Sequence, residues 1–179
     1  MKKLILISTI LFSVFTSFGQ VPTFQWAKQL GGTAVDLGYS LSVDAVGNIY
    51  TTGSFQGTAD FDPSVSTAVL TSAGNYDIFI SKFDPWGNFL WAKRIGGTQD
   101  EEGISIVVDS NNVYVTGGFS GTVDFNPGVG VYNLSAPSGG ALEIFVLKLD
   151  ASGNFIWAKR MGGGSGGDRG YSIKVDGDG

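Results

Sequence analysis

The chain of 179 residues contains no cysteine and no histidine. Without cysteine there is no disulfide, so the stability of the fold must come from packing. Without either residue the chain has no Ser-His-Asp or Cys-His nucleophilic centre and no zinc site built on these ligands. Glycoside hydrolysis needs only two carboxylates. That class therefore stays open, although no acidic pair stands apart from the turns.

Positive charge is also scarce, because 11 Lys and Arg face 16 Asp and Glu. An acidic surface repels phosphate backbones, and we therefore expect no nucleic-acid partner. The acidic residues are compatible with a calcium-containing exterior.

Long apolar runs are limited to the N-terminus, where residues 1–19 predict a secretory signal peptide. Two lysines precede the apolar run at 4–15, and small residues at 17 and 19 stand three and one positions before a predicted cut at Gln20. The run is shorter than the roughly 20 residues of a membrane-spanning helix. No second run follows, so we predict no transmembrane segment in the mature chain. With no cysteine for lipid attachment, the predicted localisation is secreted or cell surface.

The rest of the chain repeats one pattern. The motif Phe-x-Trp-Ala-Lys-x-x-Gly-Gly begins at Phe24, Phe89 and Phe155, so consecutive copies are 65 and 66 residues apart. A fixed period over the whole mature chain indicates a repeat architecture. The 28 glycines fall at fixed places in the period, which indicates turns and not disorder.

Each period contains four strand-like segments. The first alternates apolar and polar residues, as a half-buried strand does, and the third is apolar on both faces, as a strand between two layers is. The fourth is the Trp-Ala-Lys segment. The first three cover residues 39–44, 48–55 and 78–83, with counterparts at 104–109, 112–119 and 144–149.

Short turns join these segments. At 44–48, 84–88 and 150–154 an Asp opens the turn and a Gly follows three residues later. We expect the Asp side chain to cap the turn and the Gly to adopt the left-handed conformation. The turn at 109–112 is one residue shorter, and asparagine is expected to replace the glycine there.

Four antiparallel strands per repeat describe one blade of a β-propeller, and a blade needs a neighbour on each face. We predict an all-β fold, a β-propeller segment of two complete four-stranded antiparallel blades plus flanking strands. We also expect the chain to be the N-terminal piece of a longer protein. The predicted layout within the propeller region 20–179 is an orphan outer strand at 24–37, blades at 38–102 and 103–169, and the start of a third blade at 170–179.

These motifs resemble the SBBP (beta-propeller) repeat family. The resemblance rests on Trp-Ala-Lys-x-x-Gly-Gly, Val-Asp-x-x-Gly-Asn-x-Tyr-x-Thr-Gly, Asp-Phe-Asp-Pro and Ile-Phe-x-x-Lys-x-Asp, and it covers residues 24–179. It implies a secreted bacterial protein of the Bacteroidota type, in which such repeats often precede a C-terminal sorting domain for export to the cell surface. It implies no catalytic activity, because the family has no common catalytic motif.

The long connections between second and third strands are candidate metal sites. Each contains Gly-Thr-x-Asp-Phe-[Asp/Asn]-Pro and is expected to form an extra hairpin that protrudes from one face. Asp60 and Asp62, and then Asp124 and Asn126, are candidate calcium ligands. The alternative is an Asx-Pro turn in which the Asp caps backbone amides. We favour the turn, since a calcium loop usually has three or more such ligands, and predict no other cofactor.

An acidic residue stands two positions before the first-strand glycine in every copy, at Asp36, Glu101 and Asp168. If the first strand is innermost, these carboxylates form a ring that binds a cation or a basic partner in a central channel. The alternative, which we favour, is a turn cap at the entry of the strand.

Trp86 interrupts the repeat, because the third copy has Ser152 at that position. An exposed Trp on a turn is able to stack on a sugar ring, and the alternative is packing on a neighbouring loop. The three tryptophans that recur with the period, Trp26, Trp91 and Trp157, are expected in the core.

The sequence thus favours a secreted or surface-displayed, non-catalytic binding or scaffold protein. Its expected contact surface is the pair of loops at 56–76 and 120–142, repeated blade by blade, with an extracellular glycan or protein as partner. One alternative is a secreted polysaccharide-active enzyme whose catalytic residues lie beyond residue 179. Another is a spacer that presents a distal domain.

Overall fold

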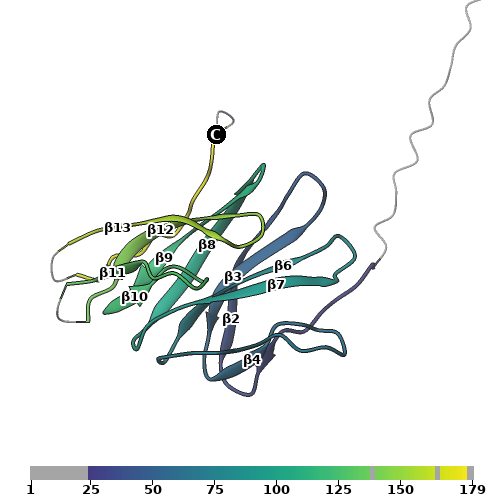
Figure 1. Cartoon of the computed structure of the whole chain (residues 1–179), viewed down its shortest axis with the longest axis horizontal. Coiled ribbons are helices and arrows are strands. Elements are labelled where there is room, and N and C mark those ends of the chain that lie inside the picture. The colour runs from purple at the N-terminus through teal and green to yellow at the C-terminus, as the bar shows by residue number, and fades with distance from the viewer. Residues whose placement is uncertain (1–23, 138–139, 164–165, 177–179) are drawn as a thin grey trace, which may run out of the picture.

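The computed structural model describes residues 24–137, 140–163 and 166–176, so the predicted signal peptide at 1–19 lies outside the described residues. The regular structure of the described residues consists of 13 β-strands. Most of them form two four-stranded antiparallel sheets that pack against each other (Figure 1). The predicted all-β class is therefore confirmed.

Each sheet is a meander that follows the chain. The first contains β2 (Asp36–Val43), β3 (Ile49–Phe55), β6 (Asp77–Phe83) and β7 (Phe89–Ile95), in that spatial order. The second contains β8 (Glu101–Asp109), β9 (Asn112–Phe119), β12 (Glu143–Asp150) and β13 (Phe155–Met161), again in chain order. This is the form of a propeller blade. The two blades make an open segment of a propeller and do not close into a ring.

The connection between second and third strands contains an extra hairpin in both blades, as predicted. In the first blade β4 (Thr58–Asp60) pairs with β5 (Val69–Thr71), and in the second β10 (Thr122–Asp124) pairs with β11 (Asn133–Ser135). The short strand β1 (Gly31–Gly32) adds to β4.

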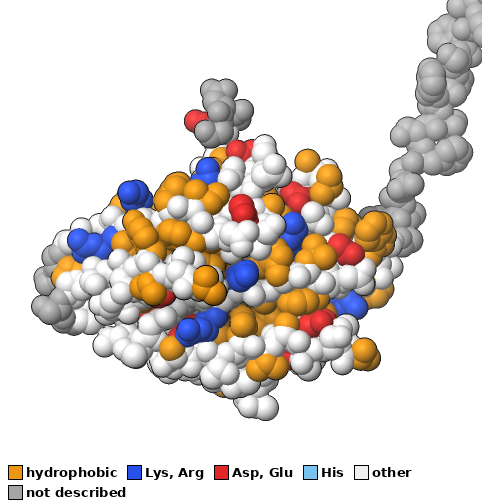
Figure 2. All heavy atoms as spheres, viewed as in Figure 1, with side chains coloured by type: hydrophobic (Ala, Val, Ile, Leu, Met, Phe, Trp, Pro, Cys, Tyr) orange, Lys and Arg blue, Asp and Glu red, His pale blue; other side chains and the backbone are white. Residues whose placement is uncertain are grey.

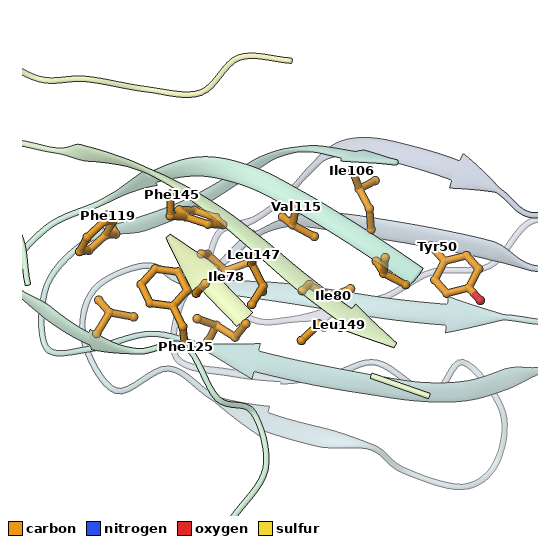
Figure 3. Packing of buried hydrophobic residues seen from close by; sticks show 14 residues of the cluster. Tyr50, Ile78, Ile80, Ile106, Val115, Phe119, Phe125, Phe145, Leu147 and Leu149 are labelled. Atoms are coloured by element: carbon orange, nitrogen blue, oxygen red, sulfur yellow. The ribbon is translucent and has the colours of Figure 1, made fainter. Parts of the chain in front are cut away.

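The main core lies between the two blades. Figure 3 shows Ile78 and Ile80 of β6 facing Leu147 and Leu149 of β12, and all four side chains are fully buried. Burial of this apolar area is the main contribution to the stability of the pair. Nearly every residue of β6 is buried, as the sequence predicts, whereas burial alternates along β12 because its second face carries no further sheet in the described chain.

The first strands of successive repeats lie beside each other and share hydrogen bonds. The amides of Ile106 and Val108 on β8 donate to the hydroxyls of Ser40 and Ser42 on β2, at 3.3 and 3.1 Å. The amide of Ile173 donates in the same way to Ser105 on β8, at 3.3 Å. Segment 170–176 therefore lies against β8 as β8 lies against β2.

The Asp-x-x-Gly turns form as predicted. In the turn between β6 and β7, Asp84 Oδ1 accepts the amides of Trp86 and Asn88 at 2.9 and 2.8 Å, and Gly87 has a φ of 79°. The shorter turn between β8 and β9 differs from the prediction. Ser110, and not an asparagine, takes the positive φ there, at 48°.

Two predicted strands are not formed in the structure. Residues 24–30 form no strand, and neither do residues 170–176. A strand requires a neighbouring strand with which its backbone forms a continuous series of hydrogen bonds. In the described chain neither segment pairs with a strand in this way. The two four-stranded sheets begin at Asp36 and Glu101. Each start is two residues earlier than the blade boundary predicted from the sequence, at 38 and 103.

Candidate functional site

The Asp of each Asp-Phe-[Asp/Asn]-Pro motif organises its loop through backbone amides. Asp60 Oδ1 accepts the amides of Asp62 at 3.0 Å and Ala68 at 2.8 Å, and Asp124 Oδ1 accepts those of Asn126 at 3.0 Å and Tyr132 at 2.8 Å. The hydrogen bonds from Ala68 and Asp62 lower the pKa of Asp60. These carboxylates therefore close the hairpins at β4–β5 and β10–β11.

The second polar residue of the motif caps the following turn. Asp62 Oδ1 accepts the amide of Ser64, and Asn126 Oδ1 accepts the amide of Gly128, both at 2.9 Å. Asp and Asn serve equally as acceptors here, which explains why the repeat tolerates the exchange. No group of three or more His, Cys, Asp or Glu in the described residues is placed to hold a metal ion.

Replacing Asp124 by Ala removes an acceptor that two loop amides share. Hydrogen bonds to a charged group contribute about 1.5–3 kcal/mol each to stability, so we expect a clear fall in the melting temperature. If the carboxylate only caps amides, the fall is the same in calcium and in chelator. Calorimetry of wild type and Asp124→Ala under both conditions measures this. A calcium-dependent rise in wild type that vanishes in the variant would contradict the capping role.

The aromatic residue of the motif anchors the hairpin to its blade. Phe125 is fully buried, and its ring centroid lies 5.2 Å from that of Phe119 and 5.0 Å from that of Phe145. Phe61 is buried in the same way against Phe55 and Phe79 in the first blade. The extra hairpins therefore pack onto their sheets. Their tips remain exposed, as at Val65 and Val129, so the hairpins are anchored at the base by the Phe.

Each hairpin is also bound to the preceding repeat. Gly31 and Gly32 pair with Asp60 and Ala59, and Gly96 forms the corresponding bridge to Asp124. The Gly-Gly end of one Trp-Ala-Lys segment thus joins the loop of the next repeat. This junction brings two distant parts of the motif together at the surface.

A cleft opens at each of these junctions. The larger, which we call the β7 cleft, has a volume of about 390 Å³. It lies between β7 and the loop that follows β10, with Leu70 and Ala92 as apolar lining. Its polar lining consists of Lys93, Arg94, Asp124 and Asn126.

The equivalent junction one repeat earlier holds a smaller cleft of about 240 Å³, which we call the N-terminal cleft. It is lined by Lys28, Asp62, Pro63 and Ser64, the repeat counterparts of residues in the β7 cleft, and by the turn around Gly87. The same place in the fold therefore carries a cleft in two consecutive repeats. Three of the four residues that the sequence suggests as metal ligands line these clefts.

The acidic residues before the first-strand glycines lie at the same junctions. Asp36 Oδ2 accepts the amide of Gly32 at 2.7 Å, and Glu101 Oε2 accepts that of Gly97 at 2.8 Å. Glu101 is 0% exposed, so its carboxyl is enclosed between blades and does not face an open channel. Asp168 is half-buried.

Burial raises the pKa of Glu101 to about 8, and the negative charges of Asp77 and Asp100 act in the same direction. The amide of Gly97 and the guanidinium of Arg94 oppose this shift. The second carboxyl oxygen, Oε1, is buried without a hydrogen-bond partner. Both observations indicate a carboxyl group that carries a proton in the folded state at neutral pH.

The buried proton makes stability depend on pH. The pKa of Glu101 rises from 4.5 to about 8 on folding, so its stabilisation is complete below pH 4.5 and is lost as pH rises toward 8. The slope is at most about 1.4 kcal/mol per pH unit. Glu101→Gln keeps an acceptor for Gly97 and should remove this slope, as urea unfolding between about pH 5 and 9 would show. Equal slopes in variant and wild type would argue against a buried proton.

Sequence reasoning missed a buried ion pair at the start of each third strand. Asp77 is fully buried and lies 2.6 Å from Arg94, and the counterpart pair of Glu143 and Arg160 is separated by 3.5 Å. The sequence does contain a signal for these pairs. In both complete repeats an acidic residue stands just before the predicted third strand, and an Arg directly follows Trp-Ala-Lys. In the first copy of the motif that position is Gln29.

The recurring tryptophans lie at the junctions and not at the centre of the core. Trp26 donates its indole N–H to the Pro85 carbonyl of the next turn, and Trp91 donates to the Ala151 carbonyl, both at 3.2 Å. Both side chains are half-buried, as is Trp157. The core position predicted from their period is thus only partly correct.

Trp86 is the exposed tryptophan that the sequence analysis singles out. Its side chain is 74% exposed on the turn between β6 and β7. The next residue, Gly87, lines the N-terminal cleft. The structure therefore places an exposed aromatic ring on the turn that borders one of the two clefts.

The fold defines this part of the chain as a β-propeller segment. In agreement, residues 25–58 match the family described as SBBP, Beta-propeller repeat. The chain is also similar to an uncharacterized WD repeat-containing protein of Acanthamoeba polyphaga mimivirus, with 29% identity over 159 residues, 74% of this chain and 11% of the relative. The chain thus spans about a ninth of the length of this relative. Among the described residues, no helix has the length and apolar character to cross a membrane.

Proposed function

We propose that the protein is a secreted or surface-displayed, non-catalytic binding and scaffold protein that contacts extracellular glycan or protein through the clefts between successive repeats. The observation that carries this proposal is the recurrence of one cleft at two junctions, each built from a Trp-Ala-Lys segment and the loop of the next repeat. Repetition of a modest site favours multivalent contact, in which avidity grows without a strong single site.

Several features support this class of function. The two clefts present polar side chains and backbone, and Trp86 adds an exposed ring beside one of them. The most enclosed carboxyl groups, those of Asp77, Glu101 and Glu143, are buried at the junctions, out of reach of a large substrate. The signal-peptide pattern at 1–19 and the repeat type support export, of the kind common in Bacteroidota.

Filling both clefts tests the proposal. Ser64→Trp and Gly128→Trp place bulky rings at the rims of the N-terminal and β7 clefts, at exposed positions. The amide bonds to Asp62 and Asn126 are retained, and Ser64→Trp removes only the exposed bond from the Ser66 amide to the Ser64 hydroxyl. The full chain and the double variant are compared on an array of neutral and acidic glycans and of extracellular matrix proteins. We expect the double variant to melt as wild type does and to lose binding. Binding that survives the double substitution would place the contact surface elsewhere.

A further inference from the structure

The β7 cleft differs from the N-terminal cleft in its charged residues. Asn126 in the β7 cleft takes the place of Asp62 in the N-terminal cleft. The residue after the cleft lysine is Arg94 in the β7 segment and Gln29 in the first copy. One exchange removes a negative charge and the other adds a positive one. The carboxylate of Asp77 offsets the charge of Arg94, and Asp124 has its repeat counterpart in Asp60 at the N-terminal junction. Residue for residue, the β7 junction is therefore the more positive by one unit of charge.

Three nitrogen donors of this cleft are available to a ligand. Lys93 makes no hydrogen bond or salt bridge with the described residues, although its charge helps to lower the pKa of Asp150, and Asn126 uses only its Oδ1, in the bond to Gly128. Arg94 is bound to Asp77 at 2.6 Å through one nitrogen, with its side chain 35% exposed. A guanidinium has five N–H donors in a rigid fork, and the buried Asp77 fixes its position while leaving the others to face the cleft.

The remaining lining suits a sugar ring. Asp124 offers a carboxylate whose Oδ1 is already oriented by two amides, and it is able to accept a hydroxyl. Leu70 and Ala92 provide an apolar surface for the C–H face of a ring. A volume of about 390 Å³ is within the range of small-ligand pockets. Figure 2 shows that Lys and Arg side chains (blue) and exposed hydrophobic side chains (orange) are interspersed on the displayed face.

We infer that the β7 cleft binds the carboxylate-bearing sugar unit of an acidic polysaccharide. Arg94 and Lys93 hold the carboxylate, Asn126 donates to a ring or hydroxyl oxygen, and Asp124 accepts a hydroxyl. This inference rests on the proposed glycan-binding function and names the class of glycan. A charge-assisted bond to Arg or Lys is stronger than a neutral one, so a uronate should be distinguished from its neutral counterpart.

The test uses the full chain and two probes that differ only in charge, a trisaccharide of galacturonic acid and its methyl ester. Titration calorimetry should show binding of the free acid that weakens as salt is raised. Asn126→Asp restores the residue of the N-terminal cleft and still accepts the Gly128 amide. It should reduce affinity for the acid at least about tenfold. Lys93→Gln should also weaken binding, whereas Lys159→Gln, at the exposed counterpart position of the next repeat and outside both clefts, should not.

Each outcome has a distinct meaning. Equal affinity for acid and ester, or no effect of Asn126→Asp, would overturn the inference. Binding of neutral glycans alone on the array described above would also overturn it, while the proposed function would stand. If no glycan on that array bound the chain, then the glycan part of the proposed function would itself fail.

Discussion

Replacing Gly117 by alanine is expected to destabilise the second blade by about 3 kcal/mol or more. Gly117 lies in the middle of β9, between Gly103 and Phe145 on the neighbouring strands. A Cβ atom there would overlap the backbone carbonyl of Glu102. The ladder between β8 and β9 has a register shift next to this pair, between Gly103 and Ser105. The backbone cannot move aside as the end of a side chain can.

The adjacent residue gives a matched control. A Cβ on Gly118 would meet Arg169 Cγ at 3.3 Å, which is part of a flexible side chain. Gly118→Ala should therefore change stability by less than about 1 kcal/mol. Urea unfolding of both variants measures the difference. If both variants lost the same stability, the close approach of β8 to β9 would not explain why the repeat motif has Gly after Thr, as at Thr116-Gly117.

Replacing Phe125 by alanine is expected to cost about 3–5 kcal/mol, the usual range for a buried Phe. Its ring is fully buried between Phe119 and Phe145 and links the β10–β11 hairpin to the blade. Because the β7 cleft is formed by the loop after β10, the variant should also lose ligand binding. Val131→Ala in the same hairpin removes a side chain that is 73% exposed and serves as the control. Equal destabilisation by both would mean that Phe125 is not the anchor.

The period and the alternation of apolar residues were sufficient to predict both blades. Alternation within a short segment shows which side chains of a strand face the core, and the period shows that the same strands recur. The role of Phe61 and Phe125 was not accessible in this way. A single aromatic residue between two polar residues has no periodicity. The sequence therefore indicated a turn or a calcium site in the extra hairpin and gave the aromatic ring no role. Its partners, such as Phe145, become neighbours only when the sheet is formed.

The segments at 24–30 and 170–176 show a different limit. Their sequences match β7 and β2 in pattern, yet a strand also needs a partner beside it, and local pattern does not report one. The same limit applies to the acidic residues that precede the first-strand glycines. Spacing indicated that Asp36 and Glu101 cap a turn or face a channel, but only the packed structure shows that Glu101 is enclosed.

The two clefts could be predicted only in part. The loops at 56–76 and 120–142 stood out from the sequence, and Asp62, Asp124 and Asn126 do line the clefts. The contribution of Lys93 and Arg94 comes from the preceding repeat, some 30 residues away in the chain. It follows from the bridge between Gly96 and Asp124, which no local pattern indicates.

The central claim is that each repeat is stabilised by stacking on its neighbour. Native-state hydrogen exchange on wild type and Ile80→Ala tests it most directly, because Ile80 belongs to the first blade and is fully buried in the core against the second. We predict that the substitution lowers the protection of amides in β9 and β12 as much as in β3 and β6. Unchanged protection in β9 and β12, with loss confined to the first blade, would contradict the claim.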